Sequence, residues 1–116
     1  MDERLEKALE FSNFMVTLDN QIRNLREKFY QDTIFYHNGG QFSVTKELIS
    51  FCKAMSDNNQ VSLVLVDDND MPVQIENLSE FINAITDNYV QSSNSFLNDY
   101  NMLRKKRSVE FIINES

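Results

Sequence analysis

The sequence predicts an α+β fold with the element order α-β-β-α-β-β-α, and three observations indicate it. A strand–turn–strand–helix pattern occurs twice, over residues 33–58 and 61–107. Apolar residues recur at heptad spacing in residues 1–32, which is typical of a long helix. The segments between the helices are rich in β-branched and aromatic residues around turn-forming ones. We expect a single domain over residues 1–116, in which two ββα units form a small, mainly antiparallel sheet with two long terminal helices.

The N-terminal helix is predicted over residues 1–32 because this segment contains no glycine or proline. Its apolar residues occupy both core positions of a heptad repeat across about three heptads: Ala8, Phe11, Met15, Leu18, Ile22, Leu25 and Phe29. Further apolar residues widen the stripe beyond a strict two-stranded seam, so the helix is expected to pack against more than one neighbour.

The two predicted hairpins have turns of different residue composition. The first contains Asn38-Gly39-Gly40, residue types that tolerate positive φ in a tight turn. The second begins with the apolar run Val61–Val66, predicted to be a central strand, and turns at Asp67–Asp70. Pro72 then marks the following strand as an edge strand or as its first residue.

The other two helices have clear starts. Thr45 is suited to cap a helix from Lys46 to Ser56, and Asn77 to cap the last helix, with Glu80 completing a capping box. No glycine or proline follows Asn77, so the last helix is expected to reach Lys106 or beyond. Its apolar residues also follow a seven-residue seam: Ile82, Tyr89, Phe96 and Leu103.

The helix Thr45–Asn58 resembles the start of the last helix, Asn77–Asn88, when the two are aligned thirty residues apart. Identical residue types then align at five positions: Leu48 with Leu78, Phe51 with Phe81, Ala54 with Ala84, Asp57 with Asp87, and Asn58 with Asn88. Cys52 aligns with Ile82, so apolar character is kept where identity is lost. We therefore interpret the chain as two side-by-side units, each with one apolar face, which favours a protein-binding platform over a ligand pocket.

The formal net charge of −7 disfavours nucleic acid as a partner, because phosphate binding needs a concentrated basic surface. The basic run Arg104–Arg107 is better explained as a complement to the C-terminal dipole of a helix. No apolar stretch approaches the length of a membrane span, and no signal-peptide pattern occurs. We expect a soluble intracellular protein.

No residue cluster predicts a chemical reaction. Cys52 lies on an apolar helix stripe and is expected to be a buried hydrophobe. His37 has no metal ligands at suitable spacing, and Asp67–Asp70 lacks the EF-hand pattern, so a solvated turn is expected there. Gly39-Gly40 is not followed by the lysine of a phosphate-binding loop. We expect no enzymatic activity, no cofactor and no bound metal.

Several short motifs, read in order, resemble a domain of unknown function found in bacteriophage tail-fibre and tail-fibre-assembly proteins. They are Asn20-x-x-Arg23, Gly40-Gln41-Phe42, the hairpin Asp67–Ile75, a helix opening on Leu78, and the ending Leu103-Arg104. The resemblance covers about residues 11–107. That family often has a tryptophan before the second turn, where this chain has Leu65 and Val66. The resemblance implies a small phage protein concerned with virion assembly. Three alanines against fourteen asparagines indicate an AT-rich genome, which fits a T4-like phage.

Two functions are expected from these observations. The first is a non-enzymatic virion or tail-fibre assembly factor, or accessory structural protein, that acts by protein–protein contact in the infected cell's cytoplasm or on the virion. The second is a small acidic regulator that binds a transcription or replication enzyme during infection. The terminal helices are expected to project past the sheet and form a dimer or higher bundle. Its contact residues would be Met15, Leu18, Ile22, Leu25, Tyr89, Phe96 and Leu103.

The C-terminal residues Phe111, Ile112 and Ile113 have two interpretations. They could act as a short docking peptide for a partner. Alternatively, they cap the core of the monomer, which is the interpretation we favour.

Overall fold

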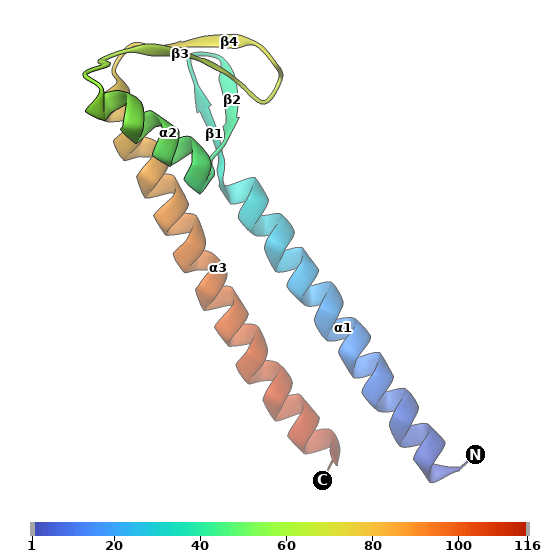
Figure 1. Ribbon diagram of the computed structural model, residues 1–116. Coiled ribbons are helices and arrows are strands. Elements are labelled where there is room, and N and C mark those ends of the chain that lie inside the picture. Colours follow the sequence, from blue (N-terminus) through green and yellow to red (C-terminus); the bar gives the residue numbers. More distant parts are fainter. Residues whose placement is uncertain (1, 116) are drawn as a thin grey trace. The chain divides into compact units, whose positions relative to one another are not determined.

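The computed structural model describes residues 2–115, and the side chains of residues 2–106. It confirms the predicted α+β class and element order (Figure 1). The elements are α1 (Glu3–Asp32), β1 (Ile34–His37), β2 (Gly40–Ser43), α2 (Lys46–Asp57), β3 (Leu63–Val66), β4 (Pro72–Ile75) and α3 (Leu78–Glu115). The four strands form two two-stranded antiparallel sheets, where the sequence analysis expected one small sheet.

The chain divides into two compact units, which we describe separately. The helical unit comprises the chain up to Lys28 and from Ser95 onward, and the sheet unit comprises Phe29–Asn94. The helical unit therefore contains most of α1 and the second half of α3. The sheet unit contains both hairpins, α2, the last turn of α1 and the first half of α3.

The first hairpin has the turn that its sequence predicts. Asn38 and Gly39 both have positive φ, +48° and +77°, and they form the two-residue loop between the paired residues His37 and Gly40. Positive φ at both loop residues is the geometry of a type I′ turn, whose twist matches that of the strands. Phe42 and Val44 from this segment enter the core.

The second hairpin has a longer loop. Val66 pairs with Pro72, and the loop between them is closed by a hydrogen bond from Asp67 N to Met71 O (2.9 Å). Asp70 has a φ of +61°, which lets the chain reverse before β4. Pro72 is the first residue of β4, a position where its missing N–H leaves no ladder bond unmade.

The predicted helix caps are present. Thr45 Oγ1 accepts a hydrogen bond from Leu48 N (3.1 Å) at the start of α2, and Asn77 Oδ1 accepts one from Glu80 N (3.0 Å) at the start of α3. Within the sheet unit, Asn88 Nδ2 donates to Asp32 O (3.0 Å), which satisfies one carbonyl at the end of α1.

The core of the sheet unit is drawn from both hairpins, α2 and α3: Phe42, Val44, Cys52, Leu65, Val73, Ile75, Leu78, Phe81 and Ile85. Phe81 lies at its centre, with edge-on contacts to the rings of Phe42 and Phe35. Cys52 is fully buried, which raises the pKa of its thiol, as expected for a residue that serves as a small hydrophobe.

The sequence similarity between α2 and the start of α3 does not extend to the burial of every aligned residue. Phe81 is 2% exposed, but its aligned residue Phe51 is 49% exposed. Cys52 is instead the residue of α2 that is fully buried. Phe51 and Phe81 therefore do not occupy equivalent positions, although other aligned residues, such as Leu48 and Leu78, lie against or within the same core.

Candidate interaction surfaces

The turn of the second hairpin is hydrogen-bonded to the edge of the first. Asp67 Oδ2 accepts from Gln41 N (3.0 Å), and Asp68 Oδ1 accepts from Ser43 N (3.1 Å). Asp68 N in turn donates to Gln41 O (2.8 Å). Two carboxylates and one peptide group thus occupy the positions that a third strand would take beside β2, and Figure 1 shows the β3–β4 turn near this strand. The hairpins are joined mainly through side chains, with one backbone hydrogen bond, and they remain two separate sheets.

The contact is reinforced from the first hairpin. Asn38 Nδ2 donates to Gln74 O (2.8 Å), which covers the outer edge of β4. Gly40 lies so close to β4 that a Cβ atom placed on it would be 2.5 Å from Val73 Cγ2. Glycine is therefore required at position 40 for close approach, whereas at position 39 it suits the positive φ.

Asp67 is not the solvated turn residue that the sequence analysis expected, because only 7% of it is exposed. Its Oδ1 accepts from Asn69 N and Met71 N (both 2.9 Å), and its Oδ2 from Gln41 N. These bonds stabilise the carboxylate and hold its pKa below the ordinary value, with those from Met71 and Gln41 the largest causes. The expectation of a solvated turn holds for residues 68–70, which are exposed. It is wrong at Asp67, because this residue packs on β2 through a contact that local sequence does not encode.

This lowered pKa predicts acid sensitivity. A carboxyl whose pKa is lower in the folded state than in the unfolded state stabilises the fold above its unfolded pKa, about 3.9, and loses this contribution as the pH falls through the folded pKa. We expect the free energy of unfolding to fall below about pH 4, more steeply in the wild type than in Asp67→Asn. Urea titrations at pH 7, 4 and 2.5 measure this, and parallel pH profiles for the two proteins would contradict it.

The net charge is distributed unevenly between the two units. The sheet unit contains nine acidic residues and only two basic ones, Lys46 and Lys53, so it carries the whole formal charge of −7. The helical unit contains nine acidic and nine basic residues and is neutral. The two units are therefore suited to different partners: an acidic surface attracts cationic groups, whereas a neutral one lets identical copies approach.

The helical unit leaves much apolar surface uncovered. No residue of α1 is buried, although its apolar residues keep heptad spacing. Seven apolar side chains described in this unit are between 38% and 70% exposed: Leu5, Leu9, Phe11, Met15, Val16, Leu97 and Met102. A pair of helices cannot enclose a stripe this wide, since each helix offers only one neighbour to the other.

The predicted contact residues lie in both units. Leu18, Ile22, Leu25, Phe96 and Leu103 are half-buried in the helical unit, and Met15 is more exposed. Tyr89 instead belongs to the sheet unit, where it packs on the core and meets the ring of Phe29 edge-on. The side chains of Phe111, Ile112 and Ile113 lie outside the described residues.

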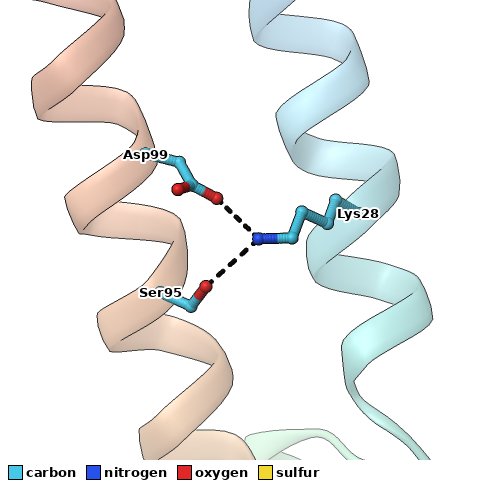
Figure 2. A network of polar contacts seen from close by, with 3 residues as sticks. All are labelled: Lys28, Ser95 and Asp99. Atoms are coloured by element: carbon cyan, nitrogen blue, oxygen red, sulfur yellow. Dashed lines mark hydrogen bonds and ion pairs between the residues drawn. The ribbon is translucent and has the colours of Figure 1, made fainter.

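A polar network connects the two helices within the helical unit. Figure 2 shows Lys28 of α1 reaching two residues of α3. Its Nζ donates to Asp99 Oδ2 (2.7 Å) and Ser95 Oγ (3.3 Å). The pair is partly exposed, so it contributes at most about 1 kcal/mol and mainly fixes which faces meet. Asp99, which interrupts the apolar pattern of α3, is explained by this contact.

No family model, curated protein or solved structure matches this chain.

No group of three or more potential metal-ligating side chains occurs in the described part of the chain, and none of the helices there has the length and apolar character of a membrane span. His37 contacts the rings of Phe35 and Phe81, which indicates a packing role.

A hollow of about 220 Å³ lies in the sheet unit, and it is smaller than typical ligand pockets. Its lining residues are Phe29, Tyr30, Thr33, Ser43, Val44, Thr45, Lys46, Glu47 and Tyr89. The buried hydroxyl of Thr33 already donates to Tyr30 O (3.0 Å). The hollow thus offers little polar recognition to a small molecule.

Proposed function

We propose that this chain is a non-enzymatic protein that acts by protein–protein contact, as an assembly factor or accessory structural protein of a bacteriophage virion or tail fibre. The uncovered apolar surface of the neutral helical unit carries the protein-binding part of the proposal. The phage context depends on the motif resemblance. The protein would act in the cytoplasm of the infected cell or on the virion.

The motif residues have structural roles that are compatible with the resemblance. Arg23 Nη2 donates to Asn20 Oδ1 (2.9 Å), a contact between residues one helical turn apart. Gly40 and Gln41 are both part of the junction between the hairpins. The motifs thus describe how the fold is held together, and they transfer no catalytic residue.

A second copy of the chain is the first partner we propose for the helical unit. Complete burial of one large apolar side chain contributes about 1.5–3 kcal/mol, so seven that are about half exposed hold about 8 kcal/mol per copy. Two copies together hold about 16 kcal/mol, which exceeds the estimated 4–15 kcal/mol that association costs in lost freedom. Half-buried residues such as Leu18 and Ile22 would add to this sum. Self-association at micromolar concentration is therefore expected.

Replacing Leu18 or Leu9 by glutamate should at least halve the molar mass measured by light scattering at micromolar concentration. A charge placed on the contact must be desolvated, whereas the sheet unit is unaffected and keeps its circular dichroism signal. Leu9, which is 47% exposed, tests the surface without disturbing much packing inside the monomer. Asn24→Glu adds the same charge to an exposed position of α1 and should leave the mass unchanged.

Two outcomes would contradict self-association. A strictly monomeric wild-type protein at micromolar concentration would directly contradict self-association. A Leu18→Glu variant that unfolds as a monomer, with Leu9→Glu unchanged in mass, would show that the seam is core.

The acidic sheet unit favours the alternative function, a small regulator that binds a transcription or replication enzyme during infection. A charge of −7 within residues 29–94 could imitate nucleic acid on the basic surface of such an enzyme. A pull-down from infected cells separates the two functions: tail-fibre or other virion precursors favour assembly, whereas polymerase or clamp components favour regulation.

A further inference from the structure

The outer edge of β3 is open to an additional strand. β3 pairs only with β4. Because Asp67 N donates to Met71 O, the alternation of an antiparallel ladder directs the N–H and C=O groups of Val64 and Val66 away from β4. Within the described part of the chain, no backbone hydrogen bond from another element reaches these groups.

The edge also carries an apolar face. Val64 and Val66 are 58% and 66% exposed, and Val61, which precedes the strand, is 79% exposed. Proteins usually protect such an edge with charge, proline or a bulge, and β3 contains none of these. The contrast with β2 and β4 is informative, because their outer edges are covered by Asp67, Asp68 and Asn38.

Charge determines which strand fits this edge. β3 leads directly into the turn Asp67–Asp70, where Asp68 and Asp70 are exposed, and both lysines of the sheet unit lie elsewhere, on α2. An antiparallel second copy would bring residues from about 58 to 65 beside this turn, and these include no basic residue. A second copy therefore offers no charge complementary to Asp68 and Asp70, whereas a cationic segment does.

We propose that β3 binds an extended segment of another protein, by strand addition, and that this segment has apolar residues at alternate positions and lysine or arginine at its N-terminal end. In an antiparallel arrangement, the N-terminal end of the added strand lies beside Asp68 and Asp70. Its alternate side chains cover Val64 and Val66, and its backbone pairs with their outward groups. The inference deepens the proposed protein-binding function by naming the chemistry of a partner, and it uses a surface separate from the helical unit.

The probe for this site is the synthetic peptide Lys-Lys-Thr-Val-Thr-Val-Thr, acetylated and amidated at its ends, with a matched peptide in which both lysines are glutamate. Fluorescence anisotropy with the full-length protein measures affinity, and nuclear magnetic resonance follows the Val64 and Val66 amides. We expect the lysine peptide to bind at least about tenfold more tightly than the glutamate peptide and to protect both amides from exchange. Added salt should reduce the difference.

Val64→Pro tests the edge itself, since it removes an outward N–H without breaking the ladder to β4, and Leu63 before it is already extended. Affinity for the lysine peptide should fall at least about tenfold in Val64→Pro and stay nearly unchanged in Val64→Thr, which keeps the N–H. The Tyr36→Pro protein, changed at the corresponding outward position of β1, should bind the lysine peptide with the affinity of the wild type. Thermal unfolding of each variant confirms that it is folded.

Three results would overturn the proposal: no binding of the lysine peptide, equal binding of the glutamate peptide, or undiminished binding to folded Val64→Pro. A fall in molar mass of the Val64→Pro protein alone would show that a second copy occupies the edge, and would also overturn it. Loss of self-association in Leu9→Glu with peptide binding intact would support the proposed function and leave this site in place. The two proposals can thus fail separately.

Discussion

Replacing Phe81 by alanine is expected to lower the free energy of unfolding of the sheet unit by about 3–5 kcal/mol. Phe81 is 2% exposed, and its ring meets those of Phe35, His37 and Phe42 at centroid distances of 5.9, 5.2 and 5.6 Å. Removing the ring loses its burial and leaves a cavity that three fixed neighbours cannot fill. Because domains of this size are stable by only about 5–15 kcal/mol, the variant would be close to unfolding.

Phe51→Ala is the matched control, because Phe51 aligns with Phe81 in the thirty-residue repeat but is 49% exposed. Its loss should be about 1 kcal/mol or less. Urea denaturation followed by far-ultraviolet circular dichroism measures both variants. Equal losses would contradict the different burial of α2 and α3.

A methyl group at Gly40 is expected to destabilise the sheet unit by about 1–3 kcal/mol, the usual cost of overpacking. The new Cβ would be 2.5 Å from Val73 Cγ2 and 3.3 Å from His37 O, and Val73 is a stiff, buried side chain that cannot move aside freely. The hairpins would have to separate, which would also strain the bond from Asn38 to Gln74.

Two further variants separate crowding from backbone conformation. Gly39→Asn should cost only a few tenths of a kcal/mol, because a Cβ there meets open space and asparagine tolerates a φ of +77°. In Gly40→Ala combined with Val73→Ala, the new methyl group occupies the space of the removed one. The double variant should therefore be about 1 kcal/mol more stable than the sum of the two single losses predicts. Additive losses in the same urea titrations would contradict the close contact.

The element order was predictable because local signals agreed with one another. Thr45 and Asn77 each cap a helix that keeps apolar periodicity, and Asn38-Gly39 suits a two-residue hairpin loop. Such signals involve only a few neighbouring residues, so they can be recognised without knowledge of the tertiary structure.

The junction between the hairpins was not predictable, because it depends on contacts between distant residues. Asp67 and Asp68 bond to residues 26 and 25 positions earlier, respectively, and a run of aspartates ordinarily indicates a solvated turn. The burial difference between Phe51 and Phe81 was missed for a related reason. Identity between two segments does not reveal how each helix is rotated toward a shared core.

The candidate contact surfaces were predictable only in part. The heptad spacing of α1 indicates an apolar stripe, and the structure leaves that stripe largely exposed in the helical unit. The open edge of β3 has no sequence signal of its own, since Val61–Val66 suits a central strand equally well. β3 is an edge strand because it pairs only with β4, while the turn Asp67–Asp70 bonds to β2.

The carboxylates beside β2 have a consequence for synthesis on the ribosome. Residues 33–44 can form their hairpin soon after they emerge, but the N–H groups of Gln41 and Ser43 have no partner until Asp67 and Asp68 follow. During that interval the nascent hairpin has an exposed β2 edge that a neighbouring nascent chain could pair with. The completed turn closes this edge within the same molecule. We therefore expect aggregation of nascent chains to be lowest when the ribosome does not pause between the two hairpins.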